Sequence, residues 1–157
     1  MKVRPYRQGD APALAALFHA AVHGIARRHY SPEQLAAWSP VTPDPARFEA
    51  RAVGGGIILV ATDEASDTPL AYGILETDGH IDHLYCRPDA AGTGVTAMLY
   101  EALESAARER GMARLYTEAS EPARRFFAKQ GFRLIERNDF ELAGVAIYNF
   151  RMEKGLS

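Results

Sequence analysis

The chain has 157 residues, of which 47% are hydrophobic and 24% are charged, and its formal net charge is -2. This length favours a single domain over residues 1–157, and the composition excludes a disordered chain. Because Lys and Arg are not in excess over Asp and Glu, we expect neither a nucleic-acid partner nor a membrane partner.

The first third of the chain is predicted to hold one strand and three helices. Lys2–Tyr6 is a strand candidate, and Gly9-Asp10 is expected to stop it and to cap a helix that begins at Ala11. Apolar residues then recur at helical spacing. Ser31-Pro32-Glu33-Gln34 has the pattern of a capping box at the start of a second helix. Pro45–Val53 is a candidate for a third, short helix.

The middle of the chain is predicted to form three antiparallel strands. Ile57–Ala61 is an apolar run of strand length, and Pro69–Thr77 and His80–Cys86 follow it after short connections. Asp78-Gly79 between the last two strands marks a tight hairpin.

The last part of the chain alternates between helices and strands. A helix is predicted from the glycines at 92 and 94 to Arg110, with Gly111 at its C-terminal cap. Ala113–Thr117 is a strand candidate and Glu121–Gln130 a helix candidate, and a strand pair follows from Phe132 onward. Strands, helices and hairpins in this order predict a mixed α+β architecture.

The segment Ala91–Thr96 is the most informative part of the sequence, because a glycine loop there leads from a strand into a helix. Such a loop presents free backbone N–H groups and the positive end of a helix dipole, which suits a phosphate or diphosphate. The glycines could instead serve only a tight turn. They also fit a relaxed dinucleotide fingerprint, as in an oxidoreductase, but the preceding antiparallel hairpins disfavour that interpretation.

Two motifs at the appropriate separation resemble the GNAT N-acetyltransferase superfamily. Leu84–Pro88 followed by the glycine loop is similar to its motif A, in which a strand ends before Gln/Arg-x-x-Gly-x-Gly/Ala opens a helix. Ser120–Phe132 is similar to motif B, with Ala123, Phe127 and Gly131-Phe132 at the family's spacing. The resemblance spans nearly the whole chain.

This resemblance implies a GNAT-like α+β fold: a central, mostly antiparallel twisted sheet with helices on both faces and a splayed strand pair. It implies acetyl-coenzyme A as co-substrate, no metal, and direct transfer of the acetyl group to a primary amine of a small molecule or peptide. The cofactor-binding residues that it implies are Leu84, Tyr85, Cys86, Ala91, Gly92, Thr93, Gly94, Val95, Thr96, Ser120 and Phe127.

Four positions depart from the family pattern. Ala91 stands where Arg or Gln is usual, and Thr96 stands where Gly or Ala is usual. Ser120 replaces an Asn that contacts the cofactor arm, and Phe127 replaces a Tyr that often protonates the leaving thiolate. A phenyl ring cannot donate a proton. These changes leave open a second interpretation, a weak or inactive GNAT-like domain that binds or senses acyl-coenzyme A.

The family's usual general base is a carboxylate on the strand His80–Cys86, and the resemblance directs this role to Asp82 or His80. Strand alternation predicts that both share one face with Leu84 and Cys86, and that Ile81, His83 and Tyr85 lie on the other face. A histidine that titrates near neutrality is a sensible base. The alternative is a polar hairpin end exposed to solvent.

For the acceptor amine, the sequence offers Tyr30 and Trp38 beside the second helix and Tyr148 on the last strand, which is also a replacement acid for Phe127. Aromatic residues in the positions of Tyr30 and Trp38 are more often core or rim residues, which is the alternative interpretation. His19 and His23 have the spacing of metal ligands but are expected on a solvated helix face.

The single cysteine, Cys86, is expected to be a small buried residue and not a nucleophile. A chain with one cysteine cannot form an internal disulfide. This and the lack of a signal-peptide pattern favour the cytoplasm. A monomer and a homodimer are equally compatible with the resemblance.

Overall fold

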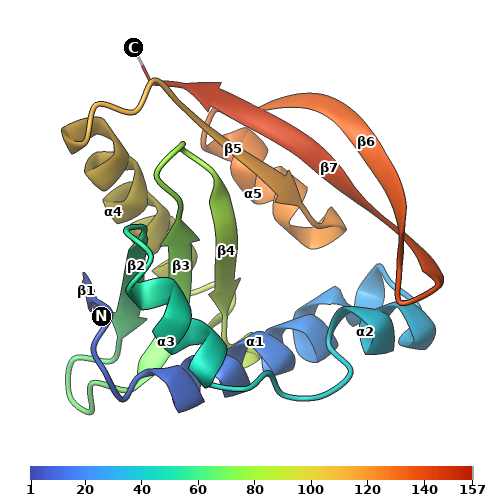
Figure 1. Cartoon of the computed structure of the whole chain (residues 1–157), viewed down its shortest axis with the longest axis horizontal. Helices are drawn as coiled ribbons and strands as arrows, with labels where there is room; N and C mark the ends of the chain where they lie inside the picture. The colour runs from blue at the N-terminus through green and yellow to red at the C-terminus, as the bar shows by residue number, and fades with distance from the viewer. Residues whose placement is uncertain (157) are drawn as a thin grey trace.

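The computed structural model describes residues 1–156 and contains two antiparallel sheets, which lie side by side (Figure 1). The first has the strand order β1-β2-β3-β4 and the second the order β5-β7-β6. The strands are β1 (Lys2–Pro5), β2 (Ile57–Thr62), β3 (Pro69–Leu75), β4 (Ile81–Cys86), β5 (Arg114–Ala119), β6 (Arg133–Leu142) and β7 (Val145–Gly155).

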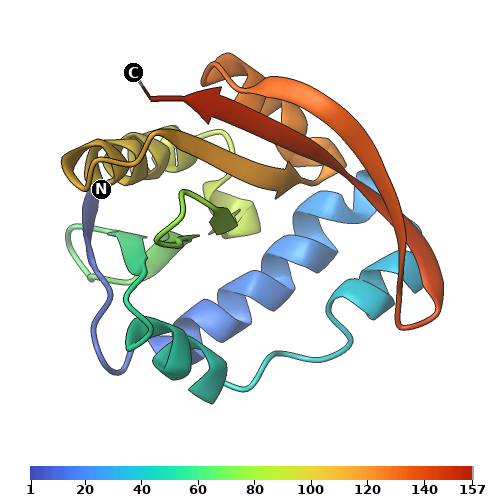
Figure 2. The ribbon, with the colours of Figure 1, turned by 45° about the horizontal axis from the view of Figure 1, so that its top comes forward.

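Helices cover both faces of the first sheet, as predicted. On one face, buried residues of α1 (Ala11–Ile25) and α3 (Ala46–Ala52) pack against β2 and β3. On the other face lies α4 (Val95–Glu109), whose Leu99 and Leu103 are fully buried. Helix α5 (Glu121–Lys129) packs against the second sheet, and α2 (Pro32–Trp38) lies near β7 (Figure 2).

The two sheets meet where β4 begins beside β5. His80, just before β4, forms an isolated parallel bridge with Tyr116 of β5. The buried Thr117 hydroxyl donates to the carbonyl oxygen of Ile81 at 2.8 Å. Beyond this point the two strands belong to separate ladders in the described part of the chain. They therefore form the splayed strand pair that the family resemblance implies, and the gap between them is available for a ligand.

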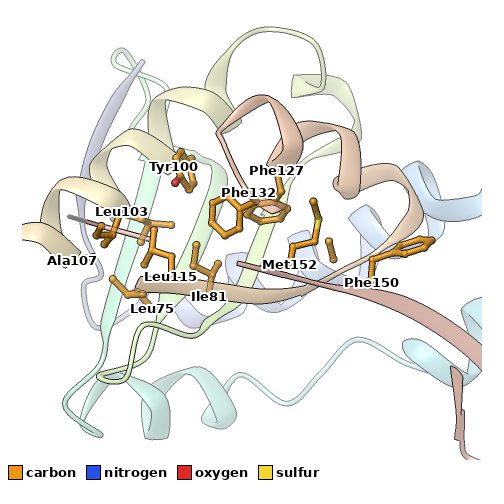
Figure 3. Packing of buried hydrophobic residues seen from close by; sticks show 12 residues of the cluster. Leu75, Ile81, Tyr100, Leu103, Ala107, Leu115, Phe127, Phe132, Phe150 and Met152 are labelled. Carbon is orange, nitrogen blue, oxygen red and sulfur yellow. The ribbon is translucent and has the colours of Figure 1, made fainter. Parts of the chain in front are cut away.

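A β-bulge at Asp82 changes which side chains of β4 face the gap. The β3–β4 ladder pairs His83 with Ile74 but Ile81 with Leu75, so Asp82 is an extra residue. Ile81 consequently packs with Leu75 in the core on the α4 side (Figure 3). Asp82 turns instead toward Arg51 of α3. The prediction of strict alternation from His80 to Cys86 is therefore wrong at Ile81 and Asp82.

Most other predicted elements are present, with ends that differ by a few residues. The capping box at Ser31 is formed, because its hydroxyl accepts from the backbone N–H of Gln34 and the Gln34 side chain accepts from the N–H of Ser31. Asp10 precedes α1 as predicted but does not cap it with its side chain. Its carboxylate is instead held by two hydrogen bonds from the guanidinium of Arg4, at 2.8 and 3.0 Å.

The two histidines of α1 have a structural role that the sequence did not indicate. His19 Nδ1 lies 2.7 Å from the hydroxyl of Ser39, and His23 Nε2 lies 2.7 Å from the carbonyl oxygen of the same residue. The predicted solvated helix face is thus wrong, because these rings hold the buried Ser39, just after α2, against α1. Among residues 1–156, no helix combines the length and apolar character that crossing a membrane requires.

Candidate active site

The glycine loop opens α4 with an uncapped N-terminus. Gly94 is the N-cap residue and adopts φ +87°, and Gly92 adopts φ +78°, a region that L side chains rarely enter. No side chain caps this helix, and its first turn has no acidic residue. A Cβ added at either glycine would meet nothing within 4 Å. The first N–H groups of the helix therefore have no side-chain partner, and the loop beside them is open, which suits a bound anion.

A cavity of about 330 Å³ begins at this loop and runs between α1 and α5 to the end of β4. Nearly all of the residues that the resemblance implies for the cofactor line it: Leu84, Tyr85, Cys86, Ala91, Gly92, Gly94, Val95, Thr96, Ser120 and Phe127. Thr93 is the exception, because its hydroxyl turns back to donate to the carbonyl oxygen of Ala90 at 2.6 Å.

Three of the unusual positions have a clear structural setting within this cavity. Thr96 and Cys86 both line this cavity, and burial raises the pKa of the Cys86 thiol above its ordinary value. Cys86 is therefore a neutral thiol and not an activated nucleophile. Phe127 is buried in the core but lines the cavity with its ring. Ser120 precedes α5 without capping it through its side chain, so its hydroxyl is free to face a ligand.

A second cavity of about 220 Å³ lies between β4, β5 and the β6–β7 hairpin. It shares Trp38, Tyr85 and Phe127 with the first cavity, as well as Leu84, Ser120 and Ala123, so the two are halves of one cleft. The three residues predicted for the acceptor, Tyr30, Trp38 and Tyr148, all line this second half.

His80 lies at the closed end of the gap and is not among the described residues that line either cavity. Its Nε2 is 2.9 Å from Glu118 Oε1, and its Nδ1 is 2.5 Å from Glu76 Oε1. The hydrogen bond with Glu118, opposed by burial and reinforced by Glu76, raises the pKa of His80 to about 9. A raised pKa favours the charged imidazole at neutral pH, and a charged imidazole is a poor proton acceptor, so this setting disfavours His80 as the general base.

Asp82 occupies a different position, because it lines the second cavity. Its Oδ2 lies 2.7 Å from Nη2 of Arg51, and the two groups form a close ion pair without the alignment of a good hydrogen bond. Across the cavity, Glu118 of β5 is a second lining carboxylate. Neither Arg51 nor Glu118 was predicted as a site residue. The alternation of side chains along the strand that ends at Ala119 gives a weak signal for Glu118, but no local pattern marks Arg51.

Glu76, His80 and Asp82 bring three possible ligand atoms within 4.8 Å of one another. The positive charge that pairs with these carboxylates is the guanidinium of Arg51, which lies 2.7 Å from Asp82 and 3.7 Å from Glu76. Both ring nitrogens of His80 are also engaged by carboxylates. The donor set is therefore that of an ion-pair network.

Comparison with known proteins agrees with this geometry. The sequence model of the acetyltransferase (GNAT) domain matches residues 26–154. The chain belongs to the GNAT acetyltransferase family. It is 30% identical over 152 residues to the uncharacterized N-acetyltransferase YafP of Escherichia coli strain K12, covering 97% of this chain and 94% of that protein.

Solved structures place this GNAT chain in the same fold. A GCN5-related N-acetyltransferase from Rhodopseudomonas palustris superposes with a TM-score of 0.89 at 37% identity, covering 99% of this chain and 95% of that one. The putative acetyltransferase yncA from Salmonella typhimurium, solved with its cofactor acetyl-CoA, gives a TM-score of 0.77 at 20% identity, with 100% and 94% covered. The predicted α+β GNAT-like fold is confirmed.

Proposed function

We propose that this GNAT protein transfers the acetyl group of acetyl-coenzyme A to a primary amine of a small molecule or peptide by direct attack. The observation that carries the proposal is the continuous cleft. One half starts at the uncapped N-terminus of α4, which suits a diphosphate, and the other half carries Asp82 and Glu118, which suit an ammonium group. The yncA structure with acetyl-CoA supports the assignment of the first half.

The end of β4 offers a donor for the thioester carbonyl. The backbone N–H of Arg87 donates to Leu70 of β3 at 2.8 Å. Because N–H groups alternate in direction along a strand, the N–H of Cys86 points away from β3 and toward the gap. A backbone donor in this place would stabilise negative charge on the carbonyl oxygen during attack.

For the general base we retain Asp82 and set His80 aside. Asp82 lines the acceptor half of the cleft, and Arg51 orients its carboxylate. A carboxylate there can take the proton of the acceptor ammonium, directly or through a water molecule. Before that proton transfer, the same carboxylate can pair with the ammonium and hold it toward the cofactor half, which supports transfer by direct attack.

The leaving thiolate needs a proton that Phe127 cannot supply. Tyr85 and Ser120 are the hydroxyl-bearing residues that line both halves of the cleft among the described residues. Burial raises the pKa of the Tyr85 hydroxyl above its ordinary value, so this group is protonated at neutral pH. We therefore assign the acid to one of these two hydroxyls in preference to Tyr148, which lines the acceptor half alone.

Calorimetry with acetyl-coenzyme A and thiol release against an amine panel test the proposal together. We expect saturable binding of acetyl-coenzyme A and thiol release that depends on an added amine. Binding without turnover of any amine would favour the alternative of an acyl-coenzyme A sensor. Lack of binding would contradict both.

A further inference from the structure

We infer that the acceptor is a primary amine with a single positive charge and a small apolar or aromatic body, without a carboxylate. This inference rests on the proposed function and specifies the substrate class of the same cleft. It derives from the acceptor half alone, that is, from the cavity of about 220 Å³ between β4, β5 and the β6–β7 hairpin.

One wall of this cavity is apolar and largely aromatic. It is made by the side chains of Tyr30, Trp38, Phe140, Leu142, Ile147 and Tyr148. These side chains also contact one another in one cluster, in which the ring of Tyr30 lies 5.6 Å from that of Trp38 and 5.2 Å from that of Tyr148. A wall of this kind gains free energy by covering an apolar or aromatic group.

The aromatic wall is held in place before any ligand binds. The hydroxyl of Tyr30 donates to the carbonyl oxygen of Tyr148 at 3.1 Å and accepts from the backbone N–H of Glu121 at 2.9 Å. Gln34 of α2 donates to the carbonyl oxygen of Ala146 at 3.0 Å. These bonds tie the start of α2 to the β6–β7 hairpin. A preformed wall loses little conformational entropy on binding, which favours rigid ring-shaped ligands.

The charged side chains that line the cavity are both acidic. They are Asp82 and Glu118, and no Lys, Arg or His is among the described lining residues. The basic partners Arg51 and His80 approach these carboxylates from outside the cavity lining. Arg137 covers the ring of Tyr148 at 4.0 Å, but it is paired with Asp139 and does not line the cavity. An ammonium group therefore finds a partner here, whereas a carboxylate finds none.

The separation of the acidic groups from the apolar wall also disfavours a second positive charge. The carboxylates of Asp82 and Glu118 belong to β4 and β5, whereas the apolar wall belongs mainly to α2 and the β6–β7 hairpin. A diamine that places one nitrogen between Asp82 and Glu118 finds no further carboxylate among the described lining residues, so its other nitrogen would lie against apolar side chains. Burial of an unpaired charge is costly, so a diamine should bind more weakly than an apolar monoamine.

The test compares three acceptors at fixed acetyl-coenzyme A: phenethylamine, phenylalanine and 1,4-diaminobutane. Phenylalanine differs from phenethylamine by one carboxylate and has the same ring. We expect kcat/KM for phenethylamine to exceed that for phenylalanine by about 100-fold or more, because the carboxylate would face Asp82 and Glu118 without a basic partner. The diamine is expected to be intermediate or undetectable.

Two variants examine the wall itself. Phe140→Ala should raise KM for phenethylamine by about tenfold while kcat changes little, because uniform binding is lost. Leu134→Ala on the same strand is the control, since Leu134 is 50% exposed and does not line the cavity. It should behave as the wild type does.

Preference for phenylalanine or 1,4-diaminobutane over phenethylamine would overturn the inference and leave the proposed function intact. Failure of all three amines would also overturn it, and calorimetry with acetyl-coenzyme A on the same sample would then show whether the proposed function fails with it. An equal effect of Phe140→Ala and Leu134→Ala on KM would contradict the inference that the apolar wall binds the acceptor.

Discussion

His80 joins two carboxylates that come from different sheets: its Nδ1 lies 2.5 Å from Glu76, which follows β3, and its Nε2 lies 2.9 Å from Glu118 of β5. Its ring also stacks on Tyr116 of β5, with centroids 4.8 Å apart. These contacts occur where the first sheet meets the second. His80 therefore stabilises the closed end of the gap between β4 and β5, and the open end of this gap is available for a ligand.

The charge of His80 should make stability depend on pH in the alkaline range. The carboxylates raise the pKa of His80 from 6.5 to about 9, so its contribution is complete below pH 6.5 and is lost as the pH rises through 9. Allowing for solvent screening of the exposed glutamates, we expect a loss on the order of 1–2 kcal/mol in the free energy of unfolding. Urea unfolding at pH 6.5 and pH 10 measures it.

His80→Gln is the matched variant for this measurement, because glutamine keeps a hydrogen-bonding side chain but does not titrate. Its free energy of unfolding should change less between the two pH values than that of the wild type. Parallel behaviour of the two proteins would show that the ion pairs of His80 contribute nothing measurable.

The assignment of the base predicts a large difference between two neighbouring residues. Asp82→Asn should lower kcat by about 100-fold or more, the usual effect of losing general base catalysis. His80→Gln should retain most of the activity, because the imidazole lies outside the cavity lining. The pH–rate profiles of both variants, with the best amine of the panel, are the measurement. A reversed order of the two effects would return the role of base to His80.

Gly94 should be required for cofactor binding beyond its effect on stability. Gly94→Ala strains a residue at φ +87° and adds a methyl group where the loop faces open space. Gly111→Ala is the control, since Gly111 has φ +73° and equal open space at the other end of α4. Each change should cost about 1–2 kcal/mol of stability. Calorimetry should show weakened acetyl-coenzyme A binding for Gly94→Ala alone, and equal affinities would argue against the loop as the phosphate site.

The buried ion pair of Arg4 and Asp10 should matter for stability in acid. Burial opposes ionisation of Asp10, but the hydrogen bonds from Arg4 and from the N–H of Arg7 outweigh it and lower the pKa below 3.8. The contribution is thus present above pH 3.8 and is lost as the pH falls further.

Asp10→Asn should lower the free energy of unfolding at pH 7 by about 2 kcal/mol, because the buried Arg4 guanidinium loses its buried carboxylate and keeps only the more exposed Asp67. The control is Asp89→Asn, which breaks the exposed pair with Arg87 and should change stability by less than about 0.5 kcal/mol. Similar losses in the two variants by urea unfolding would contradict this ranking.

The helices, the strands and the glycine loop could be predicted from the sequence alone, because they depend on local signals. A capping box, helical spacing, and glycines at a strand-to-helix junction act within a few residues of one another. The two family motifs predicted the fold. Thus the cap at Ser31, the loop at Gly94 and the succession of strands along the chain could be predicted before any contact was known. The lining of the cofactor half followed, since most of its residues adjoin the loop.

The acceptor half and the assignment of Asp82 as base depend on contacts between distant parts of the chain. The bulge at Asp82 depends on how β4 pairs with β3, and a bulge of one residue reverses the facing of its neighbours. Arg51 and Glu118 reach the site from distant parts of the chain, so no local pattern could reveal them. The pKa of His80 is likewise set by two carboxylates, one of them 38 residues away. Contacts between residues far apart in the sequence therefore give His80 the role of a structural cation, although the sequence made it a plausible base.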